Sequence, residues 1–221
     1  MLVLAVGGCA TTDEHSPDVR LSAIVETWRD QQAAGIGCQD GYEAQRPVVD
    51  CRRLMKALER LALDFPRHPD ILFAAATLAR EDGMPDKAQS YLAALSLVRP
   101  IHPEAGILRA RIAMDQGNLP LAERALREQI ELAPDHSGLR EVFASVAYLR
   151  GDFDVATRRL RAAERLGAPD WRIAYHRGLV AEAQGRTDEA SAHYRRSIDA
   201  NPGFARARSR LAGLVVGPAA D

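Results

Sequence analysis

Small and bulky hydrophobic residues recur along this chain with a fixed spacing of 34 residues. In each unit an alanine is followed four positions later by a large side chain: Ala88 and Leu92, Ala122 and Leu126, Ala156 and Leu160, Ala190 and Tyr194. A glycine precedes each pair at the same spacing, at Gly83, Gly117, Gly151 and Gly185. Proline closes the units at Pro66, Pro100, Pro134 and Pro202, and one place late at Pro169. Several landmarks that share one period indicate a repeated fold.

The local chemistry of these landmarks predicts two helices in each unit. An alanine and a bulky residue four positions apart lie on one face of a helix. Glycine favours the left-handed backbone just past a helix end, and proline stops the second helix. The segments "HPD" at His68–Asp70 and "HPE" at His102–Glu104 place a proline and an acid in the first turn of new helices. We therefore expect an all-α chain of about eleven helices.

Further helices are expected on either side of the periodic region. Upstream, the hydrophobic spacing predicts helices over Pro17–Ala34 and Cys51–Pro66, which form a pair within residues 17–68 with an inserted loop at 35–47. Downstream, residues 203–215 have the pattern of one more first helix, followed by a short tail at 216–221. A terminal helix of this kind caps a repeat array against solvent.

The periodic region resembles the tetratricopeptide repeat family, whose pattern is W-x2-L-G-x2-Y, then A-x3-F, then P. The segment that is most similar is "GLVAEAQGRTDEASAHYRRSIDANP" at 178–202. The resemblance covers residues 69–202, and its four full repeats have the register 69–102, 103–136, 137–170 and 171–204. It implies a right-handed superhelical solenoid. The chain departs from the family where tyrosine is usual in the first helix, with Ala79, Ala113, Ala147 and Ala181 instead.

The resemblance also implies a binding surface, because such repeats bind a peptide or helix of a partner protein in the concave groove of their first helices. In the family register the groove positions are Phe73, Thr77, Arg80, Ile107, Arg111, Met114, Glu141, Ser145, Tyr148, Tyr175, Leu179 and Glu182. Of these, Arg111, Tyr148 and Tyr175 are the preferred contacts. Alternatively, some of these side chains pack between neighbouring repeats.

The N-terminal segment Val6–Cys9 resembles the lipobox of bacterial lipoproteins, with an aliphatic residue and two glycines before a cysteine. The resemblance implies that residues 1–8 are the remnant of a signal peptide, that Cys9 carries the lipid, and that 9–16 form a tether. Because no Lys or Arg precedes the short apolar run, we expect a start codon further upstream. Ala10 after the cysteine favours the outer membrane. An incidental cysteine in an N-terminal tail is the alternative.

The other two cysteines are Cys38 in the inserted loop and Cys51 at the start of the next helix. A disulfide can close this spacing, and in an oxidising envelope it would contribute about 3 kcal/mol. It would also fix the inserted loop. Two free thiols are the alternative.

Charge and composition argue against two classes of function, nucleic-acid binding and membrane spanning. The formal net charge of −1 offers no basic field for nucleic acid. No stretch reaches the roughly 20 apolar residues of a membrane-spanning helix, so membrane contact is expected through the lipid alone. The arginines Arg158, Arg159, Arg161 and Arg165 lie on a second helix. Their pattern favours a solvated face over a binding patch.

Catalytic and metal-binding motifs are not found in the sequence. His68, His102 and His136 share the repeat spacing, but equivalent positions in packed helices lie about 8–10 Å apart or more. That separation is too large for one zinc ion, so these histidines are interpreted as turn residues. There is no G-x-S-x-G, H-E-x-x-H or P-loop motif. We expect no catalytic residue, metal, cofactor or small-molecule substrate.

Together these features predict a non-enzymatic scaffold for protein–protein interaction. The expected location is the periplasmic side of the outer membrane, where the chain would assist assembly of a pilus, a secretion machine or another envelope complex. The proposed role in assembly is an analogy from the expected fold and the expected location. The alternatives are a cytoplasmic adaptor and a non-catalytic subunit that recruits substrate to an enzyme.

Overall fold

The computed structural model describes residues 16–33 and 51–215, which form eleven α-helices and no strand. This confirms the all-α prediction. The chain divides into two compact units, residues 1–99 and residues 100–221. The predicted signal remnant, the inserted loop 35–47, Cys9, Cys38 and the tail lie outside the described residues, as does the tether except for its last residue. None of the described helices is long and apolar enough to cross a bilayer.

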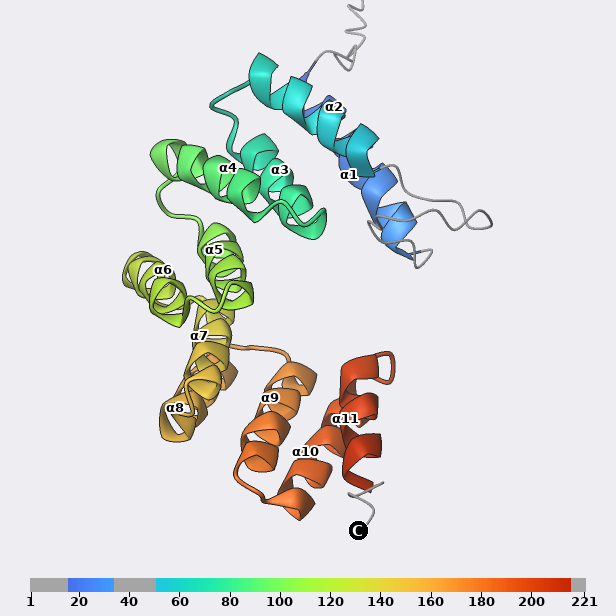
Figure 1. Cartoon of the computed structure of the whole chain (residues 1–221), viewed down its shortest axis with the longest axis vertical. Helices are drawn as coiled ribbons and strands as arrows, with labels where there is room; N and C mark the ends of the chain where they lie inside the picture. Colours follow the sequence, from blue (N-terminus) through green and yellow to red (C-terminus); the bar gives the residue numbers. More distant parts are fainter. Residues whose placement is uncertain (1–15, 34–50, 216–221) are drawn as a thin grey trace, which may run out of the picture. The chain divides into compact units, whose positions relative to one another are not determined.

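The first unit holds four helices: α1 (Pro17–Ala33), α2 (Cys51–Asp64), α3 (Pro69–Glu81) and α4 (Pro85–Val98) (Figure 1). Each helix packs on the next, and α1 also contacts α3. The side chains of Leu61 and Ile71 are fully buried between α2 and α3. Cys51, at the start of α2, is also buried. Its predicted disulfide partner, Cys38, is not among the described residues, so that pairing stays a prediction.

The second unit holds seven helices: α5 (Pro103–Asp115), α6 (Leu119–Leu132), α7 (Ser137–Leu149), α8 (Phe153–Arg165), α9 (Asp170–Ala183), α10 (Thr187–Ala200) and α11 (Ala205–Val215). Figure 1 shows three helix pairs, α5 with α6, α7 with α8, and α9 with α10. The pairs are joined because α7 contacts both α5 and α6, and α9 contacts both α7 and α8. The last helix, α11, packs on α10.

The small and large landmarks of the sequence form the core of the helix pairs. Ala156 and Leu160 on α8 are 0% and 1% exposed, and Ala190 and Tyr194 on α10 are both 0% exposed. The alanine lets the neighbouring helix approach, while the bulky residue fills the remaining space, as close packing requires. The 34-residue spacing therefore marks the buried positions of each second helix.

The turns between paired helices have the predicted glycine geometry. Gly151 has a φ of 79°, which a side chain would strain. Its N–H donates to the Tyr148 carbonyl (2.9 Å), and the next N–H, from Asp152, donates to the Ala147 carbonyl (2.9 Å). These bonds satisfy carbonyls that the helix end leaves open.

Two of the periodic histidines cap helices, which agrees with their interpretation as turn residues. Nδ1 of His102 accepts a hydrogen bond from the Ala105 N–H (3.2 Å), and Nδ1 of His136 accepts one from the Leu139 N–H (3.3 Å). His68 precedes α3 without such a bond, and its Nε2 lies 3.2 Å from a carboxylate oxygen of Asp18 on α1. Among the described residues, no group of three or more His, Cys, Asp or Glu side chains could hold a metal ion.

Candidate partner-binding surface

The predicted surface begins in the second unit on α5. Arg111 is exposed, and the half-buried side chains of Ile107 and Met114 pack against the core cluster around Phe143. These residues fall on one side of α5 because they are three or four positions apart. The helix therefore presents a guanidinium between two partly exposed apolar side chains.

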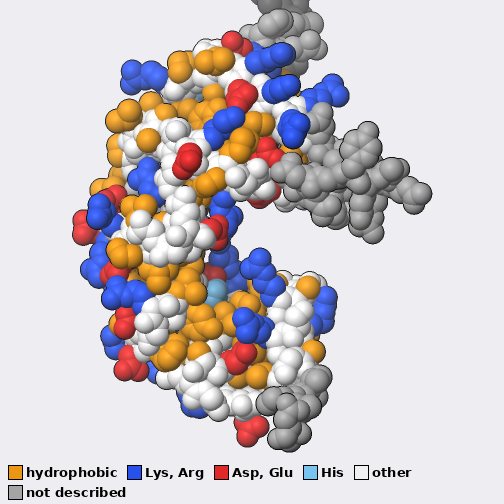
Figure 2. Space-filling model, viewed as in Figure 1, with side chains coloured by type: hydrophobic (Ala, Val, Ile, Leu, Met, Phe, Trp, Pro, Cys, Tyr) orange, Lys and Arg blue, Asp and Glu red, His pale blue; other side chains and the backbone are white. Residues whose placement is uncertain are grey.

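The same surface continues on α7 with Ser145 and Tyr148, both of them half-buried. The Ser145 hydroxyl donates to the Glu141 carbonyl within the helix (3.4 Å). The Tyr148 ring lies against Phe153, with 6.2 Å between ring centroids. A tyrosine held in this way offers a rigid face that is partly apolar and partly polar, and such residues are enriched in protein interfaces. Figure 2 shows hydrophobic and charged side chains intermingled on the visible face of this unit.

Glu141, another predicted surface residue, is instead buried between α7 and α9, with 2% of its area exposed. Its Oε1 accepts a hydrogen bond from Arg172 Nε (2.8 Å) and lies 3.1 Å from His176 Nε2. Burial alone would raise the pKa of Glu141, but His176 and Arg172 together hold this pKa below its ordinary value. Glu141 thus joins two repeats and is not accessible to a partner in this conformation.

The predicted residues of α9 also pack against neighbouring helices. The Tyr175 ring meets the edge of Phe204 (4.9 Å between centroids, 86° between planes) and lies 5.9 Å from the Tyr194 ring. Leu179 packs on the core cluster around Tyr194. These contacts attach α9 to α10 and to the start of the capping segment.

Glu182, one turn beyond Leu179, has two partners of its own. Its carboxylate accepts hydrogen bonds from the Tyr194 hydroxyl and from Arg210 Nη1 on α11 (3.1 Å). Burial and the nearby Glu182 carboxylate raise the pKa of Tyr194, so its phenol remains protonated. Glu182 therefore links α9 both to α10 and to the capping helix.

The remaining predicted residues lie on α3 in the first unit. Phe73, Thr77 and Arg80 are half-buried, and the Thr77 hydroxyl donates to the Phe73 carbonyl (2.8 Å). They occupy one side of α3, as their spacing requires. The structure thus brings the predicted residues together within each unit, while their role in binding stays a prediction.

A sequence model of the tetratricopeptide repeat matches residues 73–137 and 142–213. The chain belongs to the tetratricopeptide repeat family. No curated protein matches the chain by sequence.

Several solved structures resemble this tetratricopeptide repeat protein. TTC0263 of Thermus thermophilus, described as a thermophilic TPR protein, is 19% identical, and the match covers 91% of this chain and all of that one, with a TM-score of 0.71. PilW, described as a widely conserved type IV pilus biogenesis factor, is 11% identical over 83% of this chain and 77% of its own, with a TM-score of 0.67. PilF of Pseudomonas aeruginosa is 13% identical over 90% of each chain, with a TM-score of 0.64. At these identities the likeness shows the fold alone.

Sequence reasoning missed Arg172 and His176, the two partners of Glu141. They are four positions apart on the first helix of the fourth tetratricopeptide repeat, so they share one face of α9. The sequence does hold a signal, because an arginine and a histidine one turn apart on a first helix follow a groove-position acid in the preceding repeat. The repeat register assigns Glu141 to the groove because it does not take account of Arg172 and His176 in the next repeat.

Proposed function

We propose that this chain is a protein–protein interaction scaffold that holds a peptide or helix of a partner on the first helices α5 and α7. The family match carries this proposal, because tetratricopeptide repeats serve chiefly as scaffolds. Arg111, Ser145 and Tyr148 form the centre of the proposed surface. The residues of α9 contribute less, since Tyr175 and Glu182 already hold the capping helix.

We further propose that the scaffold is located at the periplasmic side of the outer membrane and is anchored by lipid on Cys9. The lipobox-like segment Val6–Cys9 supports this proposal. A Cys38–Cys51 disulfide, which we propose with it, would suit an oxidising compartment. The fold likeness to PilW and PilF makes assembly of a pilus, a secretion machine or another envelope complex the preferred role. The chain would then act without catalysing a reaction.

Partner capture in living cells tests the scaffold role. A photo-crosslinking residue replaces Tyr148, and the same residue at Arg165 serves as the control, because Arg165 is exposed on the second helix α8. We expect crosslinks to an envelope protein from position 148 and few from position 165. Crosslinks only to cytoplasmic proteins would favour a cytoplasmic adaptor, and crosslinks only to one enzyme would favour a recruiting subunit. Capture from position 165 without capture from position 148 would contradict the proposed surface.

Metabolic labelling with a fatty-acid analogue tests the address independently. The chain expressed from its native gene should carry the label and stay with the membrane fraction, and Cys9→Ser should lose both properties. A wild-type chain without label would contradict the anchor, and it would leave the crosslinking result to be interpreted separately.

A further inference from the structure

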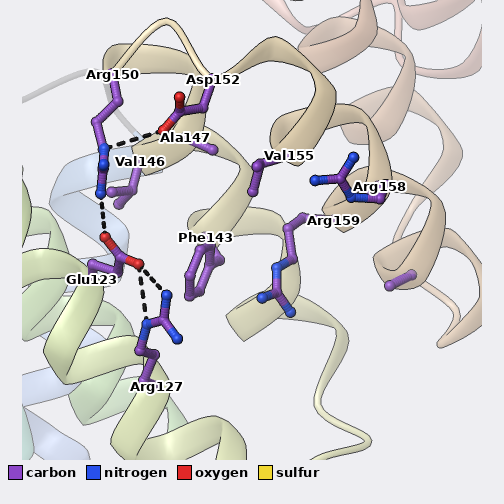
Figure 3. Close-up of a pocket in the computed structure, with 11 residues that line it drawn as sticks. Glu123, Arg127, Phe143, Val146, Ala147, Arg150, Asp152, Val155, Arg158 and Arg159 are labelled. Carbon is purple, nitrogen blue, oxygen red and sulfur yellow. Dashed lines mark hydrogen bonds and ion pairs between the residues drawn. The ribbon is translucent and has the colours of Figure 1, made fainter.

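A surface hollow of about 490 Å³ lies between α6, α7 and α8 in the second unit (Figure 3). Its floor is apolar and consists of Phe143, Val146, Ala147, Val155 and Ala162. Ala147 is one of the alanines that stand where the family usually has tyrosine. It is buried and packs with Ala156 on α8 and Val180 on α9. The hollow is formed chiefly by second helices, so it is distinct from the surface of the first helices.

The rim of the hollow carries two carboxylates that are already neutralised. Glu123 accepts hydrogen bonds from Arg127 and from Arg150 Nη1 (2.5 Å), and Asp152 lies 3.2 Å from Arg150 Nε. The hydrogen bond from Arg127 is the largest influence on Glu123 and, with Arg150, holds its pKa below the ordinary value. These groups form a closed network and contribute little net charge to the hollow.

Two further arginines on the rim, Arg158 and Arg159, have no carboxylate partner among the described residues. The guanidinium of Arg159 lies over the Phe143 ring, 4.3 Å from its centroid, and Arg127 approaches the same ring at 5.6 Å. Figure 3 shows Phe143 between these two side chains. Stacking orients a guanidinium while its N–H edges remain able to donate.

The electrostatic environment of Arg159 also favours an incoming negative charge. Burial lowers its pKa, and the neighbouring cations Arg140, Arg127 and Arg158 lower it further. A half-buried cation among other cations gains more from an anion than a fully hydrated one does. The sequence pattern favoured a solvated face for these arginines, and for Arg159 that interpretation is wrong, because its side chain packs on Phe143.

We propose that this hollow binds an acidic segment of a partner protein, with carboxylates paired to Arg158 and Arg159 and an apolar side chain against the half-buried Val155 and Ala162. The apolar floor favours a peptide over nucleic acid or phosphate, which would leave that floor uncovered. Two unpaired cations match one or two carboxylates and are too few for a polyanion. The site adds a second contact to the proposed scaffold and does not depend on the surface of the first helices.

The test follows the arginine Nε–H signals of the full chain by NMR. The probe is the acetylated, amidated peptide EEFEE, and QQFQQ is its uncharged match. We expect EEFEE to shift the signals of Arg158 and Arg159, and QQFQQ to leave them in place. Replacing both residues by glutamine should weaken EEFEE binding at least about ten-fold, as loss of charge-assisted pairs does. Arg165→Gln, on the exposed end of the same helix, should leave binding unchanged.

Four outcomes would overturn the proposal. Equal binding of QQFQQ would mean that carboxylates are not recognised. Unchanged EEFEE binding to the double glutamine variant, with melting temperature unchanged, would mean that the peptide's carboxylates bind outside this hollow. Equal shifts with inorganic phosphate at the same concentration would reduce the hollow to a general anion site. No shift at millimolar EEFEE would exclude binding. None of these outcomes bears on crosslinking from Tyr148, so the two proposals fail separately.

Discussion

The second unit has two equivalent hollows, in which the same arrangement of helices carries different side chains. The second hollow, of about 330 Å³, lies between α8, α9 and α10. Its lining residues Arg177, Val180 and His193 stand 34 positions after Phe143, Val146 and Arg159 of the first hollow. The spacing of helices is thus repeated, while the side chains that face the hollow are not.

The second hollow neutralises most of its own charge. Arg177 donates two hydrogen bonds to the carboxylate of Glu164 (3.0 and 2.5 Å), and Glu189 pairs with Arg186 and lies 3.7 Å from His193. Arg161 is exposed at its edge and stacks on no ring of the described residues. The first hollow, in contrast, has an aromatic floor and two arginines without carboxylates. The side chains at positions between the repeat landmarks therefore determine what each repeat can bind.

The largest effect is expected from the core positions between α9 and α10, two of the helices that form the second hollow. Gly178 and Tyr194 stand where the preceding repeat has Ala144 and Leu160. A Cβ at Gly178 would lie only 2.4 Å from Cε1 of the buried Tyr194 ring. Overpacking of about 3 kcal/mol should outweigh the roughly 1 kcal/mol gained from alanine in a helix. Gly178→Ala should therefore destabilise the chain by about 2 kcal/mol in urea unfolding.

The matched control for this change is Gly213→Ala on α11, where no described atom outside the helix's own backbone lies within 4 Å of the added Cβ. That variant should be as stable as the wild type or slightly more stable. Adding Tyr194→Leu to Gly178→Ala recreates the Ala144–Leu160 pair and should recover part of the loss. Additive losses in this double variant would show that the two sites do not clash.

A smaller effect is expected at Glu141, which joins the repeat of the first hollow to that of the second. Glu141→Gln keeps an oxygen for Arg172 and His176, and its amide nitrogen replaces Oε2, for which the described residues offer no hydrogen bond. The charge is lost and the amide N–H groups are buried without an acceptor among the described residues, so we expect a destabilisation of about 1–2 kcal/mol at pH 7.

The pH dependence gives the control for this prediction. Because the pKa of Glu141 is lower in the folded state than its ordinary 4.5, its contribution is complete above that value. It is lost as the pH falls below 4.5 through the folded pKa. The stability gap between wild type and Glu141→Gln should close over this range. A gap that stays constant down to pH 2 would mean that the charge contributes nothing.

Within the first hollow, removing a carboxylate should strengthen the binding of acid. Glu123→Gln frees Arg127 and Arg150 from their shared partner and makes the rim more positive. Affinity for EEFEE should rise a few-fold, while stability falls by less than about 1 kcal/mol, as for partly exposed ion pairs. Glu128→Gln, exposed on the same helix, changes net charge equally and should do neither. An equal gain in both variants would point to bulk charge.

The smallest effect is expected at Glu189 in the second hollow. Burial lowers the pKa of His193, and the Glu189 carboxylate partly opposes this. Glu189→Gln should lower that pKa further, as seen in an NMR titration of the imidazole signal, with stability unchanged within about 0.5 kcal/mol. A rise in the pKa would contradict the assigned ion pair.

Much of the fold could be predicted from the sequence, because its landmarks act locally. Glycine at a left-handed turn, as at Gly151, and alanine beside a bulky residue, as at Ala156 and Leu160, depend on neighbours within one helix pair. Glu141 and Arg159 could not be placed in this way, since their partners come from other helices. Glu141 depends on α9, and the position of Arg159 depends on Phe143 of α7.

Exchanging the rim residues of the two hollows tests whether Arg158 and Arg159 beside Phe143 bind the acidic peptide. Arg158→Ala with Arg159→His gives the first hollow the residues that stand 34 positions later, Ala192 and His193, and Ala192→Arg with His193→Arg does the reverse. A chain with all four changes keeps the wild-type charge and composition. Its affinity for EEFEE, measured beside the wild type, should fall at least about ten-fold, because Phe143 stays in the first hollow while the arginines move. Wild-type affinity in this chain would contradict the account.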